Sequence, residues 1–208
     1  MSYRLEKKYI INPKKYESFI KDLIQVGAKK IYKKRKIFST YYDNDHLTSY
    51  TNSEEGIVPR KKIRIRSYDT DKHSENSQLE FKISSEINRF KKTKNFKNKS
   101  EFINISKRGY LDKFYGYCKP KINVTYEREY FLLNHTRVTL DKNIIYSNMN
   151  LLKSKFFEPL SIVEFKSNIN DDMNINEYFL SNSISRFSKY CRAINAIFYN
   201  KKNYQLWR

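Results

Sequence analysis

The sequence contains few of the residues that mark disulfide scaffolds, metal clusters or disordered chains. Of its 208 residues, four are glycine, four are proline and two are cysteine. The scarcity of glycine and proline argues against a disordered or low-complexity chain. Cys118 and Cys191 do not have the spacing of metal ligands. We therefore expect reduced thiols in a cytosolic setting, with a single disulfide as the alternative.

Several functional signatures are also missing. No apolar run is long enough to cross a membrane, and the charged start from Met1 to Lys8 does not resemble a signal peptide. His46, His73 and His135 are scattered, and the chain has no His/Cys zinc motif, Walker loop, Rossmann glycine pattern or nucleophile elbow. These absences disfavour the enzyme classes that depend on those motifs, and we expect a cytoplasmic location.

Positive charge, by contrast, is abundant. Lysine and arginine number 42 against 22 acidic residues, which gives a formal net charge of +20. A field of this size favours polyanionic partners, namely nucleic acid, polyphosphate, nucleotides or an anionic membrane. Part of the charge is consistent with the codon bias of an AT-rich genome, because asparagine, isoleucine and tyrosine are frequent too. Without an internal repeat or a second hydrophobic core, the length predicts a single domain over residues 1–208.

The stretch from Pro59 to Tyr68 carries the clearest pattern. Ile63 and Ile65 alternate with three cations, so a strand here would have one apolar and one cationic face. The same alternation of charge and hydrophobe returns around Glu80, Thr139 and Glu164. Several such strands predict one sheet whose charged face looks either at bulk water, as in an ordinary antiparallel sheet, or at an enclosed ligand, as in a barrel with a charged interior. Arginine at these positions favours the second alternative, because its guanidinium binds phosphate and carboxylate oxygens in pairs.

Hydrophobic periodicity and turn residues predict the remaining elements. Strands are expected at residues 3–11, 30–43, 121–132 and 137–141, with a turn at Asn134-His135 and a further strand starting at 141–146. Helices are expected at residues 13–27, 99–118, 176–182 and 186–199. Residues 44–55 are expected to form a short helix or turn. Residues 87–98 are expected to form a loop or a strand bordering the sheet, 153–159 a loop, and 168–176 a polar linker.

The order of the charged motifs resembles one protein family. The series is Glu6-x-Lys8, Lys62-x-Arg64-x-Arg66-x-Tyr68, Glu80-x-Lys82, Tyr126-x-Arg128, Arg137-x-Thr139-x-Asp141, Glu164-x-Lys166 and Ser188-Lys189-Tyr190. It is similar to the VTC domain, the polyphosphate polymerase domain of the triphosphate tunnel superfamily that also contains the CYTH proteins. The resemblance extends from residue 3 to about residue 195, and although each motif is short, the ordered set is specific.

The resemblance implies an α+β fold, an antiparallel tunnel of about eight strands with peripheral helices and an enclosed charged face. It implies that ATP, triphosphate or polyphosphate binds inside with Mn²⁺ or Mg²⁺. Glu164 would be the leading metal ligand, with Glu6, Glu80 and Asp141 as candidates for metal binding or for orienting the cations. The residues implied to hold or contact phosphates are Lys8, Arg64, Arg66, Lys82, Arg128, Arg137, Lys166 and Lys189, with Lys62, Tyr126, Thr139 and Ser188 beside them.

The implied activity is transfer of the γ-phosphate of ATP onto polyphosphate. Two alternatives stay open, a triphosphate hydrolase of the same fold and a module that binds polyphosphate without catalysis. The Glu/Lys pairs argue against a non-catalytic module that binds polyphosphate or nucleic acid, because a pure polyanion binder has no use for buried carboxylates. Nucleic acid is the less favoured partner, and a membrane protein supplied by another chain is a further candidate. The sequence departs from the pattern at Arg4, where CYTH enzymes have a first glutamate, and at Cys191-Arg192-Ala193, where a glycine usually follows.

Overall fold

The computed structural model describes residues 4–70, 72–86, 89–149, 155–168 and 185–199. The chain divides into two compact units. Unit 1 comprises residues 1–36, 126–144 and 157–187, and unit 2 comprises residues 37–125, 145–156 and 188–208. Three long strands, β2 (Lys29–Asp43), β7 (Gly116–Leu133) and β8 (Thr136–Asn148), contribute residues to both units.

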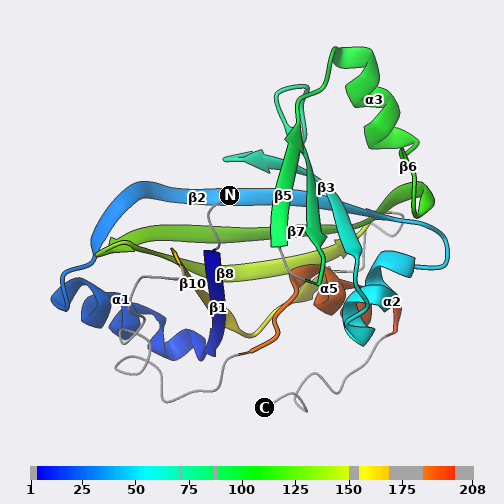
Figure 1. The fold of residues 1–208 in the computed structure, drawn as a ribbon. Helices are drawn as coiled ribbons and strands as arrows, with labels where there is room; N and C mark the ends of the chain where they lie inside the picture. Colours follow the sequence, from blue (N-terminus) through cyan, green and yellow to red (C-terminus); the bar gives the residue numbers. More distant parts are fainter. Residues whose placement is uncertain (1–3, 71, 87–88, 150–154, 169–184, 200–208) are drawn as a thin grey trace. The chain divides into compact units, whose positions relative to one another are not determined.

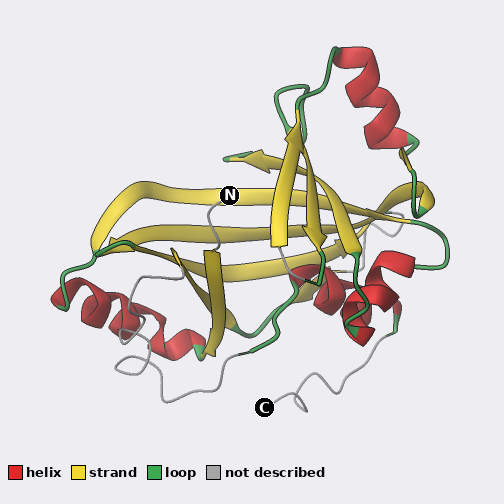
Figure 2. Ribbon diagram, viewed as in Figure 1, coloured by secondary structure: helices red, strands yellow, loops and turns green. Residues whose placement is uncertain are grey.

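Unit 1 is built from strands covered by one helix (Figures 1 and 2). Its strands are β1 (Arg4–Ile11), β10 (Ser161–Asn168) and parts of β8, β7 and β2. Asn12 accepts a hydrogen bond from the Lys14 backbone at 2.9 Å, and Pro13 begins a short 3₁₀ turn, η1 (Pro13–Lys15), that leads into α1 (Tyr16–Gln25). Proline suits this position because its fixed φ angle is already helical and its missing N–H is not needed.

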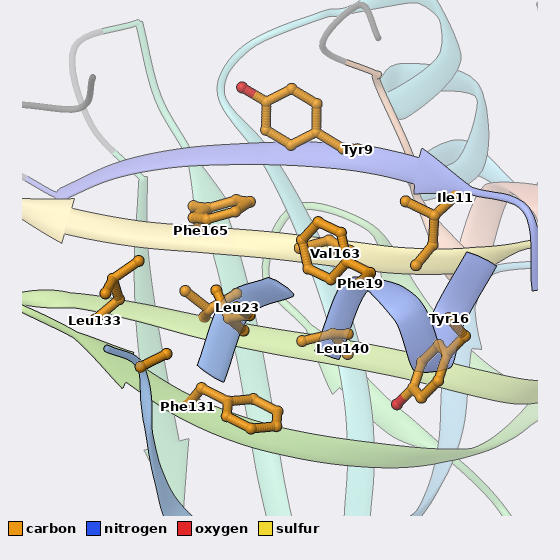
Figure 3. Close-up of a cluster of buried hydrophobic side chains, with 12 residues drawn as sticks. Tyr9, Ile11, Tyr16, Phe19, Leu23, Phe131, Leu133, Leu140, Val163 and Phe165 are labelled. Atoms are coloured by element: carbon orange, nitrogen blue, oxygen red, sulfur yellow. The ribbon is translucent and has the colours of Figure 1, made fainter. Parts of the chain in front are cut away.

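The hydrophobic core of unit 1 lies between α1 and the sheet (Figure 3). Phe19 and Leu23 of the helix contact the apolar sides of the strands, because residues of a strand alternate between the two faces of the sheet. The strand residues of this core are Tyr9, Ile11, Phe131, Leu133, Val138, Leu140, Val163 and Phe165. The charged residues that alternate with them must therefore lie on the other face.

Unit 2 contains a second core and three of the helices. Its strands are β3 (Arg60–Tyr68), β4 (Gln78–Ser84), β5 (Arg89–Lys94), the short β6 (Tyr110–Asp112) and parts of β2, β7, β8 and β9 (Lys155–Phe157). Its helices are α2 (Thr48–Glu55), α3 (Lys99–Lys107) and α5 (Lys189–Phe198). Ile63 and Ile65 of β3 pack with Leu79 and Phe81 of β4. Ile105 of α3 covers this face, so the cations of β3 again point to the opposite side.

The strands form one sheet in the order β1-β10-β8-β7-β2-β3-β4-β5, with β6 paired to β7 and β9 (Lys155–Phe157) paired to β8. The pairs β1–β10, β10–β8, β2–β3, β3–β4 and β4–β5 are all antiparallel. The expected α+β class, with an antiparallel path of eight strands and peripheral helices, is confirmed. No helix in the described ranges has the length and hydropathy needed to span a membrane.

Three local predictions need correction. The helix expected at 99–118 ends at Lys107, because Gly109 has a φ angle of +132° and the chain then forms β6 and the start of β7. The strand expected to start at 141–146 is a continuation of β8, and the loop expected at 153–159 contains β9. The linker expected at 168–176 and the helix expected at 176–182 fall almost entirely on residues 169–184, outside the described residues. Cys118 and Cys191 are buried and free, as expected for reduced thiols.

Candidate functional site

The sequence-derived candidates fall into one group in each unit. Unit 1 holds Glu6, Lys8, Tyr126, Arg128, Arg137, Thr139, Asp141, Glu164 and Lys166, which we call the mixed-charge face. Unit 2 holds Lys62, Arg64, Arg66, Glu80, Lys82, Ser188 and Lys189.

Strand register brings the mixed-charge face together in rows. Glu6 lies opposite Lys166, which lies opposite Arg137, and in the next row Lys8, Glu164 and Thr139 are opposite one another. Lys166 Nζ is 2.8 Å from Glu164 Oε1 and 3.3 Å from Glu6 Oε2. Lys8 Nζ is 3.2 Å from Glu6 Oε1 and donates to the Phe187 carbonyl at 3.1 Å. Glu6 thus lies between a cation of its own strand, Lys8, and a cation of the neighbouring strand, Lys166.

Arg128 joins two carboxylates of the mixed-charge face. Its Nε and Nη2 donate to the two oxygens of Asp141 at 2.5 and 2.7 Å, and Nη2 lies 3.8 Å from Glu164 Oε2. The guanidinium stacks over the ring of Tyr126 at 5.3 Å from its centroid. Asp141 and Glu164 are buried, whereas Arg137 is exposed at the end of the face. A charged network buried this deeply is not an ordinary solvated sheet surface.

In unit 2, strand register places lysines directly opposite one another. Lys62 of β3 is opposite Lys82 of β4, and Lys82 is opposite Lys91 of β5. Like charges directly opposite each other destabilise a sheet unless something neutralises them. With Arg64, Arg66 and Lys189 these residues form what we call the β3–β5 cationic cluster, in which six cations accompany one carboxylate, Glu80.

Glu80 lies among the side chains of the β3–β5 cationic cluster and contacts three of its cations. Arg64 donates to Glu80 Oε2 from Nε at 2.7 Å and also from Nη2, and Arg66 Nη1 is 3.8 Å from the same oxygen. Lys91 Nζ donates to Glu80 Oε1 at 2.9 Å. Burial would raise the pKa of Glu80, but the charges of Arg64 and Arg66 and the hydrogen bonds from Lys91 and Arg64 lower it to about 2. Glu80 is therefore an anion that orients the cations and cancels only part of their charge.

The start of α5 completes the β3–β5 cationic cluster. Ser188 is the N-cap of this helix and accepts a hydrogen bond from the Cys191 backbone at 3.3 Å. The same hydroxyl accepts from Lys62 Nζ at 3.1 Å. Lys189 follows directly and contributes to the positive potential around Tyr41. The Ser-Lys-Tyr motif thus attaches the helix N-terminus, itself favourable for anions, to the cationic strands.

The carboxylates of both groups can be compared with the ligand sets that hold divalent metal ions in proteins. Among the described residues, no group of three or more His, Cys, Asp or Glu side chains is close enough to hold a metal ion. Glu80 is also in the other unit from Glu6, Asp141 and Glu164. Mg²⁺ and Mn²⁺ are often held by one or two carboxylates, with phosphate and water oxygens as the remaining ligands. Glu164 and Asp141, both contacted by Arg128, fit a site in which the protein supplies only one or two carboxylates.

Two residues that contact the centre of the β3–β5 cationic cluster, Lys91 and Tyr41, were not among the sequence-derived candidates. Lys91 lies in the stretch 87–98, which was expected to form a loop or a bordering strand and was given no role in the site, yet it contacts Glu80. The register of β5 against β4 that produces this contact has no signature in the sequence, because β5 is an exposed edge strand without alternation. Tyr41 of β2, whose hydroxyl accepts a hydrogen bond from Arg64 Nη1 at 2.9 Å, was considered only as a strand residue.

Comparison with solved structures shows the fold. A proposed adenylate cyclase from Bacillus halodurans is similar with a TM-score of 0.60 at 12% identity, over 92% of this chain and 97% of the other. A conserved protein from Pyrococcus furiosus gives a TM-score of 0.54 at 14% identity, over 90% and 99%. A proposed adenylyl cyclase from Hippeastrum, described as having a dominant triphosphatase activity, gives 0.52 at 12% identity, over 94% and 96%.

These similarities confirm the triphosphate tunnel fold that the sequence led us to expect. No curated protein matches the sequence. The VTC domain family, however, matches residues 3–198, which is nearly the whole length of the chain. The chain belongs to the VTC domain family.

Proposed function

We propose that this protein transfers the γ-phosphate of ATP onto a growing polyphosphate chain. The observation that carries the proposal is the row of opposed lysines in the β3–β5 cationic cluster, Lys62, Lys82 and Lys91. Together with Arg64 and Arg66, these residues provide more positive charge than Glu80 neutralises. A triphosphate group carries several negative charges along a short chain, so it would offset the repulsion between the lysines.

Arg64 and Arg66 would orient the phosphates. Both side chains are buried, with exposed fractions of 6% and 7%, and Glu80 holds the guanidinium of Arg64 from one side. Preorganised donors in a site with little water stabilise developing charge more strongly than donors that must reorganise. Phosphoryl transfer depends mainly on positioning and charge stabilisation, so a fixed arginine pair can contribute without a covalent nucleophile.

The mixed-charge face would provide the carboxylates for a divalent cation, with Glu164 as the main ligand and Asp141 as the second. When bound, Mg²⁺ or Mn²⁺ supplies Lewis-acid polarisation of phosphate oxygens. Arg128 would hold both carboxylates in place, since it contacts Asp141 at 2.5 Å and Glu164 at 3.8 Å. Lys166, 2.8 Å from Glu164, would help to hold that carboxylate in place.

Incubation of the purified chain with ATP and Mn²⁺ tests the proposal, with the products separated on a polyphosphate gel beside an orthophosphate assay. A ladder of long chains is the expected result. Glu164→Gln should then reduce the rate strongly, whereas Glu17→Gln, at an exposed carboxylate of α1, should not. Ladders of equal intensity from both variants would remove Glu164 from the proposed metal site.

A triphosphate hydrolase is the second candidate, favoured by the description of the Hippeastrum protein as a triphosphatase of the same fold. Both reactions use the same charges and differ in the acceptor, which is water for the hydrolase. Orthophosphate without a ladder would therefore support the hydrolase. Binding of added polyphosphate without either product would support a non-catalytic module.

A further inference from the structure

Tyr41 is an uncharged side chain surrounded by the β3–β5 cationic cluster. Its hydroxyl oxygen accepts a hydrogen bond from Arg64 Nη1 at 2.9 Å, and the Arg64 guanidinium lies 5.7 Å from the centre of its ring. Tyr41 is a buried residue of β2, and its strand position is directly opposite Arg64. The phenol oxygen therefore lies at the same guanidinium that we assign to phosphate binding.

The direction of this hydrogen bond determines what the hydroxyl can still do. An arginine can only donate, so the Tyr41 oxygen must be the acceptor, and its own proton is not used in this contact. Among the described residues, none accepts a hydrogen bond from Tyr41 by the contacts seen in the structure. A buried hydroxyl usually finds an acceptor, and the surrounding cations are all donors.

The ring of Tyr41 is held in place by α5. It stacks on Tyr190 with the ring centroids 5.1 Å apart and the planes inclined by 22°. The hydroxyl of Tyr190 donates to Asp43 Oδ2 at 2.5 Å, and the same carboxylate accepts from the backbone N–H groups of Asn44, Ser49 and Tyr50. The Tyr41 ring is thus packed against a residue that is itself anchored to the N-terminus of α2. A side chain fixed in this way presents its hydroxyl in one direction.

We propose that the Tyr41 hydroxyl donates a hydrogen bond to a phosphoryl oxygen of the anion that Arg64 and Arg66 bind. The proposal rests on the proposed function of the β3–β5 cationic cluster and adds a neutral donor to it. Arginine and lysine attract any anion, whereas a phenol in a fixed orientation requires an acceptor oxygen at one position. Tyr41 would therefore favour phosphoryl chains over anions that only match the charge of the cluster.

The charges around the phenol are consistent with this role. Burial would raise the pKa of Tyr41, but Arg64, Arg66 and Lys189 lower it below the ordinary 10.0. The groups that face it are Arg64 and Arg66 from β3 and Lys189 and Tyr190 from α5, with Glu80 of β4 bound to Arg64. A more acidic phenol is a stronger hydrogen-bond donor, provided that it stays protonated.

The test is calorimetric titration of the full chain with inorganic tripolyphosphate. Tyr41→Phe keeps the ring but removes the donor, and at about pH 7.5 we expect binding about tenfold weaker than in the wild type. Tyr42→Phe is the matched control, because Tyr42 is the next residue of the same strand and lies in the apolar core of unit 2. It should bind tripolyphosphate as the wild type does.

Raising the pH separates a donor from a residue that only packs. As Tyr41 loses its proton, the phenolate repels the anion, so the advantage of the wild type over Tyr41→Phe should shrink towards about pH 10. In parallel, tripolyphosphate should raise the pKa of the most acidic phenol seen in the ultraviolet titration of the wild type, a signal that Tyr41→Phe lacks.

Each outcome decides between the proposals. Equal affinities of wild type and Tyr41→Phe, or a ratio that stays constant with pH, would overturn the role of Tyr41 and leave the proposed function intact. Failure of the wild type to bind tripolyphosphate would contradict the proposed function, and the inference about Tyr41 would fail with it. If Tyr41→Phe does not fold, an ultraviolet titration of the wild type in which tripolyphosphate shifts no phenol pKa would still overturn the role of Tyr41.

Discussion

Arg128 and Asp141 form a two-pronged ion pair within unit 1, with Nε–Oδ1 and Nη2–Oδ2 distances of 2.5 and 2.7 Å. Asp141 is almost fully buried, with 1% of its side chain exposed, and Arg128 is largely buried at 15%. Removing one partner of such a pair leaves a buried charge uncompensated, which is the costly case.

Asp141→Ala should therefore lower the free energy of unfolding by about 3 kcal/mol, measured by urea denaturation. Arg128→Ala/Asp141→Ala should cost less than the sum of the single changes, because neither charge remains unpaired. The exposed pair Lys142–Glu17 is the control, since Glu17 is 72% exposed. Glu17→Ala should cost less than about 1 kcal/mol. Equal losses of unfolding free energy in Asp141→Ala and Glu17→Ala would show that the buried pair has no special role in stability.

His73 should make the stability sensitive to mild acid. Its Nε2 lies 2.9 Å from Thr40 Oγ1, its Nδ1 contacts Ser67 Oγ, and its ring packs on Phe38. Burial lowers the pKa of His73 from 6.5 to about 4. Between these values the unfolded chain binds the proton more readily than the folded chain, so stability falls as the pH falls. The loss should approach about 3 kcal/mol.

Urea denaturation of wild type, His73→Asn and His135→Asn between about pH 6.5 and about pH 4 measures this effect. His135 lies in the exposed β7–β8 turn, so its substitution should leave the wild-type pH dependence unchanged. His73→Asn should lose less stability over the same range. A pH dependence identical in all three proteins would contradict a neutral, half-buried His73.

Gly109 should tolerate substitution less well than Gly116, although both have positive φ angles, of +132° and +69°. A Cβ atom at Gly109 would collide with the backbone oxygen of Cys118 and lie 3.1 Å from its carbonyl carbon, whereas nothing lies within 4 Å at Gly116. Gly109→Ala should cost about 3 kcal/mol and Gly116→Ala about 1 kcal/mol. Thermal or urea unfolding of the two variants measures these losses of stability. Equal losses would show that the chain moves to relieve the collision at Gly109.

Lys91 offers a test of the β3–β5 cationic cluster with a close control. Lys91→Gln should weaken tripolyphosphate binding about fivefold at low salt and less at high salt, because the side chain is half exposed and screened. Lys92 is the next residue of β5 and, by the alternation of strand residues, lies on the opposite face. Lys92→Gln removes the same charge and should change the affinity much less. Similar losses of tripolyphosphate affinity in both variants would indicate that the overall positive charge of the protein, and not the row of opposed lysines, attracts the anion.

Much of the local structure followed from the sequence, because local signals determine it. Alternation predicted β3 and the apolar side of β10. Pro13, together with the helical spacing of Phe19 and Leu23, predicted α1. Asn134-His135 predicted the β7–β8 turn. The helix over 99–118 was overextended, since its end depends on the close approach of Gly109 to Cys118, a contact made only in the folded chain.

The site residues were harder to predict than the strands. Alternation showed which residues share a face, but it could not show that Arg64 and Arg66 are buried. The contacts of Glu80 with Lys91 and of Arg64 with Tyr41 depend on strand register, which the separate motifs do not encode. The assignment of phosphate-binding and metal-binding roles still rests on the family pattern together with the charges that surround each residue.

The central claim is that the β3–β5 cationic cluster binds a triphosphate, and Arg64 tests it most directly. Wild type, Arg64→Ala and Arg108→Ala would be titrated with inorganic tripolyphosphate in a calorimeter at fixed salt. Arg108 is an exposed arginine at the end of α3, so its substitution removes the same charge away from the cluster. We predict that Arg64→Ala binds about a hundredfold more weakly than the wild type and that Arg108→Ala binds nearly as well. Equal binding by Arg64→Ala and the wild type would contradict the account.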